Sequence, residues 1–346
     1  MSVPTTLFID TSIFDKAAYN FEAASIVAFK EAIDGMDLTL LMPDPTGREI
    51  RRHISDRSAS AVKSLEGAAR KAPFLYKLSS WPLNGTNSTC LKYQIQNIVS
   101  QALSSFLNLF QVVKLEYDGV NLQEIMDWHD LRRAPFSEKK KGEFPDALAI
   151  ASINHYHANN SGNIAIISID RDFRSACERY PHLLYFQSLA SFVETIKSKD
   201  ERVASIHEAL EANDDDIRKA IANAFNNSGF LLEADWNGDI CDTELTGYDF
   251  LDHHVVGLGE DTCTITFDGK IFYEAEVSYD DYDNARWEGG EAYPMHRIEG
   301  TVEDTAHISG IVKLRVINNG EKIDGVDDII LDQSDFTITG VPEEQW

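Results

Sequence analysis

Long apolar stretches are missing from this sequence, and cysteines are few. No segment approaches the roughly 18 consecutive apolar residues of a membrane-spanning helix. The opening MSVPTTLFIDTSIF has neither the basic nor the apolar stretch of a secretion signal. The four cysteines are widely spaced and form no CxxC pair, which argues against a disulfide framework and against a zinc site. We therefore expect a cytoplasmic protein with reduced thiols.

Positive charge is also scarce, and its distribution is uneven. The chain has 31 Lys and Arg against 57 Asp and Glu, a net charge of −26. The first 200 residues hold 22 basic against 23 acidic side chains, and the remaining 146 residues hold 9 against 34. Nearly all the excess acid therefore belongs to the second part. This division predicts two domains with different electrostatic roles and a boundary near residue 200.

The first 200 residues alternate between strand and helix patterns. Apolar runs at residues 7–9, 38–42, 163–169 and 183–186 predict buried strands. A helical pattern continues from residue 11 to residue 29 with Thr11 or Ser12 as its cap, and further helices begin near Thr46 and Pro145. Residues 55–134 read as a mostly helical insertion. Together these patterns predict an α/β fold over residues 1–200, a parallel sheet between two helical layers.

After residue 200 the pattern changes. Two helices, ending near residues 213 and 226, predict a helical connector over residues 201–229. Short stretches of alternating apolar and polar residues follow, at 263–267, 271–279, 312–316 and 336–338. Gly and Asp turns separate them. We therefore expect residues 230–346 to form an acidic, antiparallel β-rich domain, either a sandwich or a small barrel.

Four carboxylates of the first part stand near the predicted ends of strands. Asp10 and Asp170 directly follow two buried strands, and ligands of parallel α/β sheets bind at that edge. Asp146 lies in the first turn of an otherwise apolar helix, and Glu49 lies on the helix that follows strand 38–42. Acids gathered in a low-dielectric cleft repel one another unless a cation holds them. This oxygen-rich set favours Mg²⁺ or Mn²⁺.

Such a site is suited to phosphodiester hydrolysis, in which metal ions activate water and neutralise developing charge. The hydroxyl groups of Thr11 and Ser12 are placed to orient water or a phosphate oxygen. Basic side chains surround Glu49 and precede Asp146, and we expect them to bind the phosphate backbone. These residues are Arg48, Arg51, Arg52, Arg57, Arg132, Arg133, Lys139, Lys140 and Lys141.

Each residue also has a purely structural interpretation. Asp10 and Asp172 can cap helices, and Asp146 can favour a helix N-terminus electrostatically. Glu49 can pair with Arg52 or His53 on its own helix. Lys139–Lys141 can be a solvated loop. Asp170 is hardest to explain structurally, because an acid that ends a fully buried strand usually has a function or a dedicated partner.

The order of four motifs resembles the PIN-domain nucleases. FIDTSIF is similar to their opening strand and Asp-Thr/Ser motif, and PTGREI to the segment that carries their glutamate. KKKGEFPDALAIAS is similar to the third-acid helix of a bacterial PIN-like branch with a Glu-Phe-Pro-Asp-Ala string, and IISIDRDF to the fourth-acid strand. The resemblance covers about residues 5–198. Nothing comparable is found for residues 201–346.

The resemblance implies metal-site roles for Asp10, Glu49, Asp146 and Asp170, with Asp172 and Glu143 as secondary candidates. It implies a metal-dependent endoribonuclease in a bacterial toxin or phage-defence role. A DNase or flap-type nuclease is the alternative enzyme, and a non-catalytic nucleic-acid-binding or scaffold protein is the alternative from another class. RNA would bind to residues 1–200. The charge of residues 201–346 has solubility as its plain interpretation. The sharper alternatives are docking of a basic protein partner, restraint of the nuclease within the chain, and Ca²⁺ binding at the Asp-rich turns.

Overall fold

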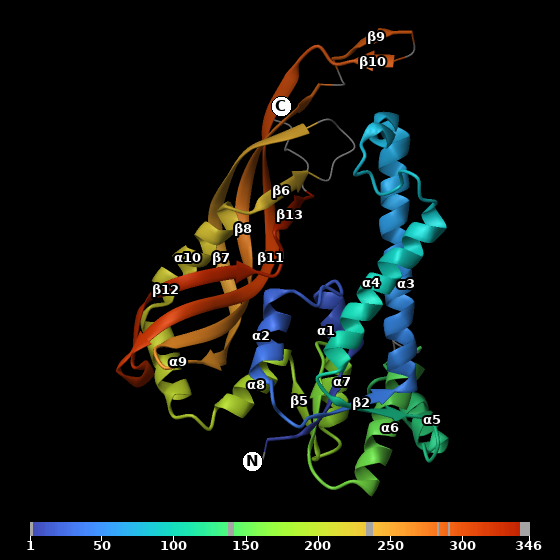
Figure 1. Ribbon diagram of the computed structural model, residues 1–346, viewed down its shortest axis with the longest axis vertical. Helices are drawn as coiled ribbons and strands as arrows, with labels where there is room; N and C mark the ends of the chain where they lie inside the picture. Colours follow the sequence, from blue (N-terminus) through green and yellow to red (C-terminus); the bar gives the residue numbers. More distant parts are fainter. Residues whose placement is uncertain (1–2, 138–141, 233–237, 282–283, 290, 340–346) are drawn as a thin grey trace. The chain divides into compact units, whose positions relative to one another are not determined.

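A computed structural model of the protein describes residues 3–137, 142–232, 238–281, 284–289 and 291–339 (Figure 1). The chain divides into two compact units. The first unit comprises Met1–Glu22 and Ile33–Phe192, and the second comprises Ala23–Ala32 and Val193–Trp346. No helix in the described part of the chain has the length and apolar character needed to cross a membrane.

The first unit is built on a five-stranded, entirely parallel sheet with the strand order β3-β2-β1-β4-β5. Its strands are β1 (Thr6–Ile9), β2 (Thr39–Pro43), β3 (Gln111–Leu115), β4 (Ile164–Ile167) and β5 (Leu183–Phe186). Its helices are α1 (Thr11–Lys16), α3 (Asp44–Lys71), η1 (Pro73–Lys77), α4 (Ser88–Leu107), α5 (Leu122–Asp130), α6 (Phe144–Asn159) and α7 (Arg171–Cys177). The predicted α/β fold with a parallel sheet is confirmed.

The strand order places a topological switch at the centre of this sheet. The chain starts at β1, moves outward to β2 and β3, and then returns to β4 on the other side of β1. Ile9 pairs with Ile167 in parallel register, so β1 and β4 end side by side. The four residues of β4 (IAII) are all buried, which explains the unbroken apolar run. Ligands of open α/β sheets bind at such a switch.

Two predictions for the first unit are wrong in detail. Residues 111–115 form strand β3, where a helical insertion was expected. The sequence did not indicate this edge strand (QVVKL), because it is mostly exposed and lacks an apolar run. The helix expected from residue 11 to 29 is interrupted after α1, where Ala18 and Tyr19 take positive φ angles of 49° and 59°. Asp10, not Thr11 or Ser12, is the N-cap of α1.

Helix α2 (Ala24–Ala32), the second part of that expected helix, belongs to the second unit. It packs against two strands of that unit, β7 and β11. The carboxylate of Asp332 accepts hydrogen bonds from the backbone N–H and the hydroxyl of Ser25, over 2.8 and 2.7 Å. The Ser309 hydroxyl also donates to Asp332, over 2.8 Å. An N-terminal helix is thereby part of the C-terminal structure.

The remainder of the second unit is an antiparallel sheet with helices packed on it. The four-stranded sheet has the order β12-β11-β8-β7, with β7 (Gly238–Leu258), β8 (Thr262–Asp280), β11 (Arg297–Ile317) and β12 (Lys322–Leu331). The other elements are α8 (Leu189–Lys197), which spans the unit boundary, α9 (Arg202–Ala212), α10 (Asp214–Asn226), β6 (Gly229–Leu232), β9 (Arg286–Glu288), β10 (Glu291–Tyr293), η2 (Asn318–Gly320) and β13 (Asp335–Ile338). The predicted antiparallel β-rich region is confirmed.

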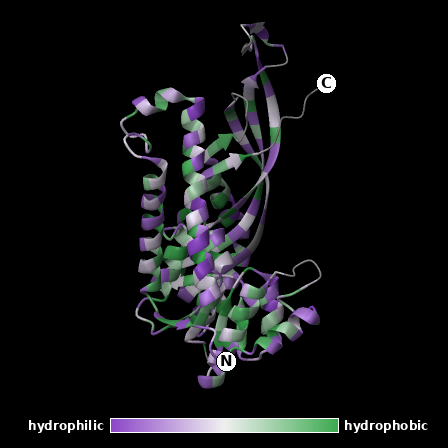
Figure 2. Cartoon of the chain, turned by 90° about the vertical axis from the view of Figure 1, so that its right-hand side faces the viewer, coloured by the Kyte–Doolittle hydropathy of each residue, from purple (hydrophilic) through white to green (hydrophobic). Residues whose placement is uncertain are grey.

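The expected sandwich or small barrel is not what the described residues form. The predicted strands 263–267 and 271–279 join into the 19-residue β8, and 312–316 lies within the 21-residue β11 of the same open sheet. The predicted strand 336–338 forms the short β13, which pairs with β6 in a separate two-stranded sheet. Its buried face packs on Ile206 of α9 and Phe225 of α10 instead of on a second sheet. Alternation along β8 buries side chains such as Ile265 and exposes others such as Glu276. In Figure 2, hydrophobic and hydrophilic residues alternate in colour along the long strands. Helices therefore supply the second layer that the sequence pattern left unspecified.

Candidate active site

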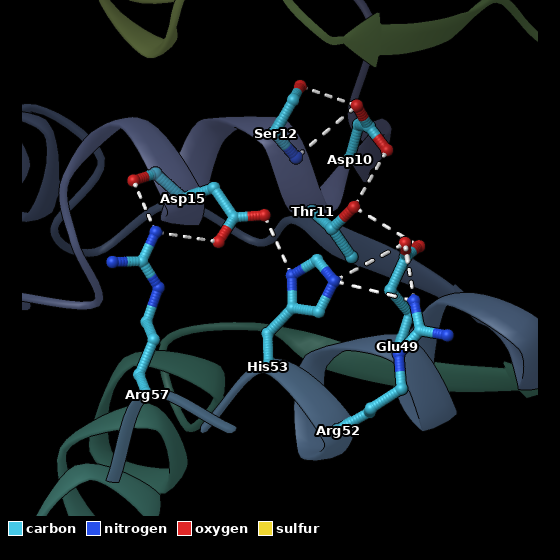
Figure 3. A network of polar contacts seen from close by, with 8 residues as sticks. All are labelled: Asp10, Thr11, Ser12, Asp15, Glu49, Arg52, His53 and Arg57. Atoms are coloured by element: carbon cyan, nitrogen blue, oxygen red, sulfur yellow. Dashed lines mark hydrogen bonds and ion pairs between the residues drawn. The ribbon is translucent and has the colours of Figure 1, made fainter. Parts of the chain in front are cut away.

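Asp10 lies at the end of β1 and is 6% exposed. Its backbone N–H donates to Ile167 O of β4 over 2.9 Å, which fixes the backbone at the switch in strand order. Its carboxylate accepts hydrogen bonds from Ser12, through the backbone N–H and the hydroxyl, as Figure 3 shows. The Asp10 carboxylate therefore caps α1 and also belongs to the candidate site.

Ser168 joins the two strand ends. Its hydroxyl donates to Asp10 Oδ2 over 2.8 Å and accepts from the backbone N–H of Asp170 over 3.0 Å. The side chain is fully buried. Sequence reasoning assigned no role to Ser168, although the Ser-Ile-Asp spacing at the end of β4 was the signal that could have identified it. One hydroxyl thus holds a candidate metal ligand and positions the backbone of another.

Thr11 and Glu49 connect this strand edge to α3. The Thr11 hydroxyl lies 3.2 Å from Glu49 Oε2 and 3.5 Å from Asp10 Oδ1 (Figure 3). A single hydroxyl proton can be donated to one of these carboxylates at a time. Arg52 Nη2 lies 3.5 Å from Glu49 Oε1, so the helix-face pair considered from the sequence is also present. Glu49 is therefore held from both sides near Asp10.

A second group of polar contacts attaches α3 to α1. His53 Nδ1 lies 2.8 Å from Asp15 Oδ2, and Arg57 Nη2 donates to Asp15 Oδ1 over 3.1 Å (Figure 3). Tyr19 packs beside them with its ring under the Arg57 guanidinium. Burial, assisted by the nearby charge of Asp15, raises the pKa of the Tyr19 phenol, so the phenol stays neutral. Sequence reasoning missed Asp15 and Tyr19, which carry no motif.

Asp146 gives the clearest electrostatic signal in the first unit. Burial, together with the negative charges of Asp10, Glu143 and Glu49, raises the pKa of its carboxyl from the ordinary 3.8 to about 8. Asp146 lies in the first turn of α6, and Glu143 is the N-cap of that helix. Carboxylates from β1, α3 and α6 are therefore close enough to destabilise one another's charged forms.

The chemistry of this donor set fits a hard divalent cation. Hard cations prefer carboxylate oxygens, and a bound cation relieves the repulsion that raises the Asp146 pKa. Among the described residues, no group of three or more His, Cys, Asp or Glu side chains is already arranged to coordinate one ion. Coordination by several of these acids would therefore require rotations of their side chains.

Asp170 and Asp172 lie at the start of α7. Asp170 is its N-cap and accepts from the backbone N–H of Asp172 over 2.7 Å. Asp172 lies in the first turn of that helix. The capping role weighed from the sequence for Asp172 falls to Asp170 instead, which also stands one strand away from Asp10.

The basic residues expected to bind phosphate lie in more than one segment of the first unit. Arg48 is exposed and pairs with Asp44 over 2.6 Å, and Arg52 pairs with Glu49. Arg132 and Arg133 follow α5, and Lys139, Lys140 and Lys141 lie outside the described residues. Their common role as a phosphate track therefore stays a prediction.

Comparison with known proteins bears on this unit. Residues 7–173 match a family model described as a PIN domain. No curated protein and no solved structure matches the chain. The matched segment contains β1, the end of β4 and the four carboxylates predicted from the sequence.

Proposed function

Because residues 7–173 belong to the PIN-domain family, whose members are generally nucleases that use divalent metals, we propose that this chain is a metal-dependent endonuclease. The observation that carries the proposal is the burial of Asp146 together with its electrostatic interaction with Asp10, Glu143 and Glu49, beside the switch in strand order. Such coupling is typical of acids that act together on a cation or a proton.

The residues divide into ligands and supports. The metal, Mg²⁺ or Mn²⁺, would be held by Asp10, Glu49, Asp146 and Asp170. Glu143 and Asp172 are secondary candidates for metal ligands. When bound, the metal supplies an activated water and neutralises charge on the scissile phosphate. Ser168 and Ser12 hold the Asp10 carboxylate in place through hydrogen bonds, and such supports tune metal affinity. Thr11 contacts two of the acids and would orient water or a phosphate oxygen.

RNA is the proposed substrate, and toxicity or phage defence the proposed role, on the strength of the motif resemblance. The same acids would cut DNA, so a DNase or flap-type nuclease is the alternative. Matched RNA and DNA single strands, incubated with Mn²⁺, would separate the two. A non-cutting scaffold is disfavoured because all four acids are present in the matched segment.

The test of the function is substitution of the ligands. Asp10→Asn and Asp146→Asn keep the side-chain shape and remove the charge that would hold a metal, and each is expected to lower the cleavage rate by about 100-fold or more. Asp130→Asn is the matched control, because Asp130 ends α5 with a side chain that is 71% exposed. Undiminished cleavage by the first two variants, in chains that bind RNA normally, would refute the site.

The acidic second part has a proposed role of its own. Residues 201–346 carry 34 acidic against 9 basic side chains, and their charge would compete with nucleic acid for the first unit or dock a basic protein. Truncation is unsuited to testing this, since α2 is part of the second unit. Neutralising Glu274, Glu276 and Glu303 to Gln in the full chain should instead tighten RNA binding at low salt only. If the wild type and this variant bound RNA with equal affinity at every salt concentration, the restraint would be ruled out.

A further inference from the structure

A pair of helices, which we call the helical arm, lies in the sequence between the candidate ligand Glu49 and strand β3. We define it as residues 58–107, which include the second half of α3 and all of η1 and α4. The two long helices lie side by side (Figure 1). Val62, Leu83 and Leu91 are buried between them, and Leu65, Trp81 and Ile95 pack on these three. The arm therefore has a small core of its own and a defined surface.

The charge of the arm is opposite to that of the chain. Residues 58–107 contain five basic side chains and one acid, whereas the whole chain carries −26. The basic residues are Lys63, Arg70, Lys71, Lys77 and Lys92. The single acid, Glu66, accepts a hydrogen bond from the Ser88 hydroxyl and so serves to join α4 to α3. The arm thus presents a basic surface that suits an anionic partner.

The arm also has exposed aromatic side chains. Phe74 and Tyr76 of η1 are 65% and 48% exposed, and Tyr93 of α4 is 61% exposed. Arg70 and Lys77 flank the first two in sequence. Phe74 and Tyr76 lie two positions apart on one short helix, and neighbouring exposed apolar groups often mark an interaction site. Aromatic rings on which bases stack, beside cations that contact phosphates, are the combination that binds single-stranded nucleic acid.

We infer that the helical arm is a binding surface for single-stranded nucleic acid, holding the substrate at a distance from the site of cleavage. The inference rests on the proposed nuclease function and adds to it a determinant of substrate length. Phe74, Tyr76 and Tyr93 stack on bases, and Arg70, Lys77 and Lys92 contact phosphates. Sequence tolerance follows, because every base offers a π-face.

The geometry of α3 sets the length of strand involved. Lys71 follows Glu49 by 22 residues on this one helix. At about 1.5 Å per residue the two positions are about 33 Å apart along the helix axis. A stacked strand advances about 3.4 Å per nucleotide, so roughly ten nucleotides separate the cleaved bond from the tip of the arm. Shorter substrates reach the acids without touching the tip.

A membrane surface is the other partner that basic and aromatic side chains can recognise. The structure favours nucleic acid, because the helix that ends at the arm's tip begins beside the candidate metal ligands. A phosphate backbone can follow that helix continuously, whereas a bilayer would contact only the tip. Vesicle binding is therefore kept as an outcome of the test.

The test uses the full chain and needs no cleavage for its first readout. Phe74→Ala/Tyr76→Ala/Tyr93→Ala should weaken binding of a strand of about 20 nucleotides roughly tenfold or more. Arg70→Gln/Lys77→Gln should lower the slope of log affinity against log salt by about 0.7 for each contact removed. Trp287→Ala/Tyr293→Ala is the matched control, since these aromatics of the second unit are 71% and 48% exposed among acidic residues.

Substrate length supplies the second readout. A strand of about five nucleotides, half the span of the arm, should bind equally to the wild type and to the aromatic variant. Equal binding of the long strand to both chains would overturn the inference. So would a loss confined to phosphatidylserine vesicles. If the long strand loses affinity while no strand is ever cleaved, the arm's role stands and only the nuclease proposal fails.

Discussion

The hydroxyl of Ser168 donates a hydrogen bond to Asp10 Oδ2 over 2.8 Å, across the ends of two neighbouring parallel strands. Both side chains are buried, so the bond is not exchanged with water. It fixes the direction in which the Asp10 carboxylate points. The same Ser168 oxygen accepts a hydrogen bond from the backbone N–H of Asp170. The candidate ligands Asp10 and Asp170 therefore both depend on Ser168, which is not itself a candidate ligand.

Replacing Ser168 is therefore expected to weaken metal binding. Ser168→Ala removes one hydrogen bond to the Asp10 carboxylate, and loss of such a support typically lowers metal affinity by about 10- to 100-fold. Mn²⁺ affinity, measured by calorimetry, checks this. Ser58→Ala is the control, because the equally buried Ser58 hydroxyl only bonds the Ile54 carbonyl within α3. Equal Mn²⁺ affinity in wild type and Ser168→Ala would contradict the supporting role.

Asp146 makes the stability of the metal-free chain depend on pH. Its pKa is raised from 3.8 to about 8, first by burial and then by the neighbouring acids. Between those two pH values the folded chain holds a proton that the unfolded chain releases, so the free energy of unfolding should fall as pH rises through that window. Asp146→Asn should reduce this dependence. Urea unfolding at pH 5 and pH 8 in the presence of EDTA measures it.

The control for that experiment is Asp130→Asn, which should keep the wild-type pH dependence because Asp130 is exposed. An identical pH dependence in Asp146→Asn and wild type would show that Asp146 titrates normally. Because the Asp146 carboxyl keeps its proton below about pH 8, Mn²⁺ binding in that range should release protons, since a ligand carboxyl must be deprotonated.

In the second unit, Glu194 of α8 lies 2.8 Å from His254 Nδ1 and 2.7 Å from His207 Nε2. Burial raises the pKa of Glu194, but hydrogen bonds from His254 and the Val255 backbone outweigh it and lower the pKa to about 2. Burial likewise lowers the pKa of His254, and its contacts with Glu194 and Asp252 outweigh that and raise it above 6.5.

The signs of these two shifts define where the pair stabilises the fold. Glu194 contributes above its ordinary value of 4.5 and loses the contribution as pH falls toward 2. His254 contributes below 6.5 and loses the contribution as pH rises through its raised pKa. Glu194→Gln should therefore lower the free energy of unfolding by about 1–3 kcal/mol near pH 5–6 and by less at pH 9.

Urea unfolding across this range tests the pair. Glu211→Gln on the exposed face of α9 is the control and should change little. His253 faces the same group with a pKa lowered mainly by burial, and the charge of Glu194 partly opposes that shift, so Glu194→Gln should lower the His253 pKa further. A difference between wild type and Glu194→Gln that does not vary with pH would rule out the ion pair as its cause.

Helix α2 makes the first 200 residues dependent on the rest of the chain. Its buried side chains, including Ile26 and Phe29, pack within the second unit. A fragment of residues 1–200 would expose them, so we expect it to aggregate or to bind hydrophobic dyes. Size-exclusion chromatography measures the outcome. A monomeric fragment with a cooperative thermal transition would contradict the assignment of α2 to the second unit.

A milder variant isolates the attachment of α2. Asp332→Ala removes the acceptor for Ser25 and Ser309 and should increase hydrogen exchange of the α2 amides by at least about tenfold, since these partly buried hydrogen bonds go to a charged group and such bonds each contribute about 1.5–3 kcal/mol. Asp328→Ala is the control, since Asp328 is half exposed and pairs only loosely with Lys313. Unchanged exchange in Asp332→Ala would mean that apolar packing alone holds the helix.

Much of the first unit could be predicted from the sequence, because its central strands are buried on both faces. Strands β1 and β4 appear as unbroken apolar runs that end at Asp10 and near Asp170, and this pattern has few other readings. Edge strand β3 could not be predicted, because exposed positions allow polar side chains and erase the pattern. Ser168 was missed for a related reason, since its importance lies in a contact with a residue 158 positions away.

The second unit was harder to predict for physical reasons. Its strands continue through glycines that look like turns. At Gly310, a side chain would meet the Ile330 carbonyl at 2.3 Å, so glycine marks a close approach between strands and not the end of one. Helix α2 carries an ordinary apolar face, and nothing local in such a face specifies which sheet will cover it. Long-range partners of this kind are decided only in the folded chain.

The most direct measurement of the central claim is an anomalous diffraction map of crystals soaked in Mn²⁺. The account predicts a peak within coordination distance of the Asp10 carboxylate and of at least one of Glu49, Asp146 and Asp170, and its loss in Asp10→Asn. A fully occupied peak elsewhere on the chain, or none near these acids at saturating Mn²⁺, would contradict it.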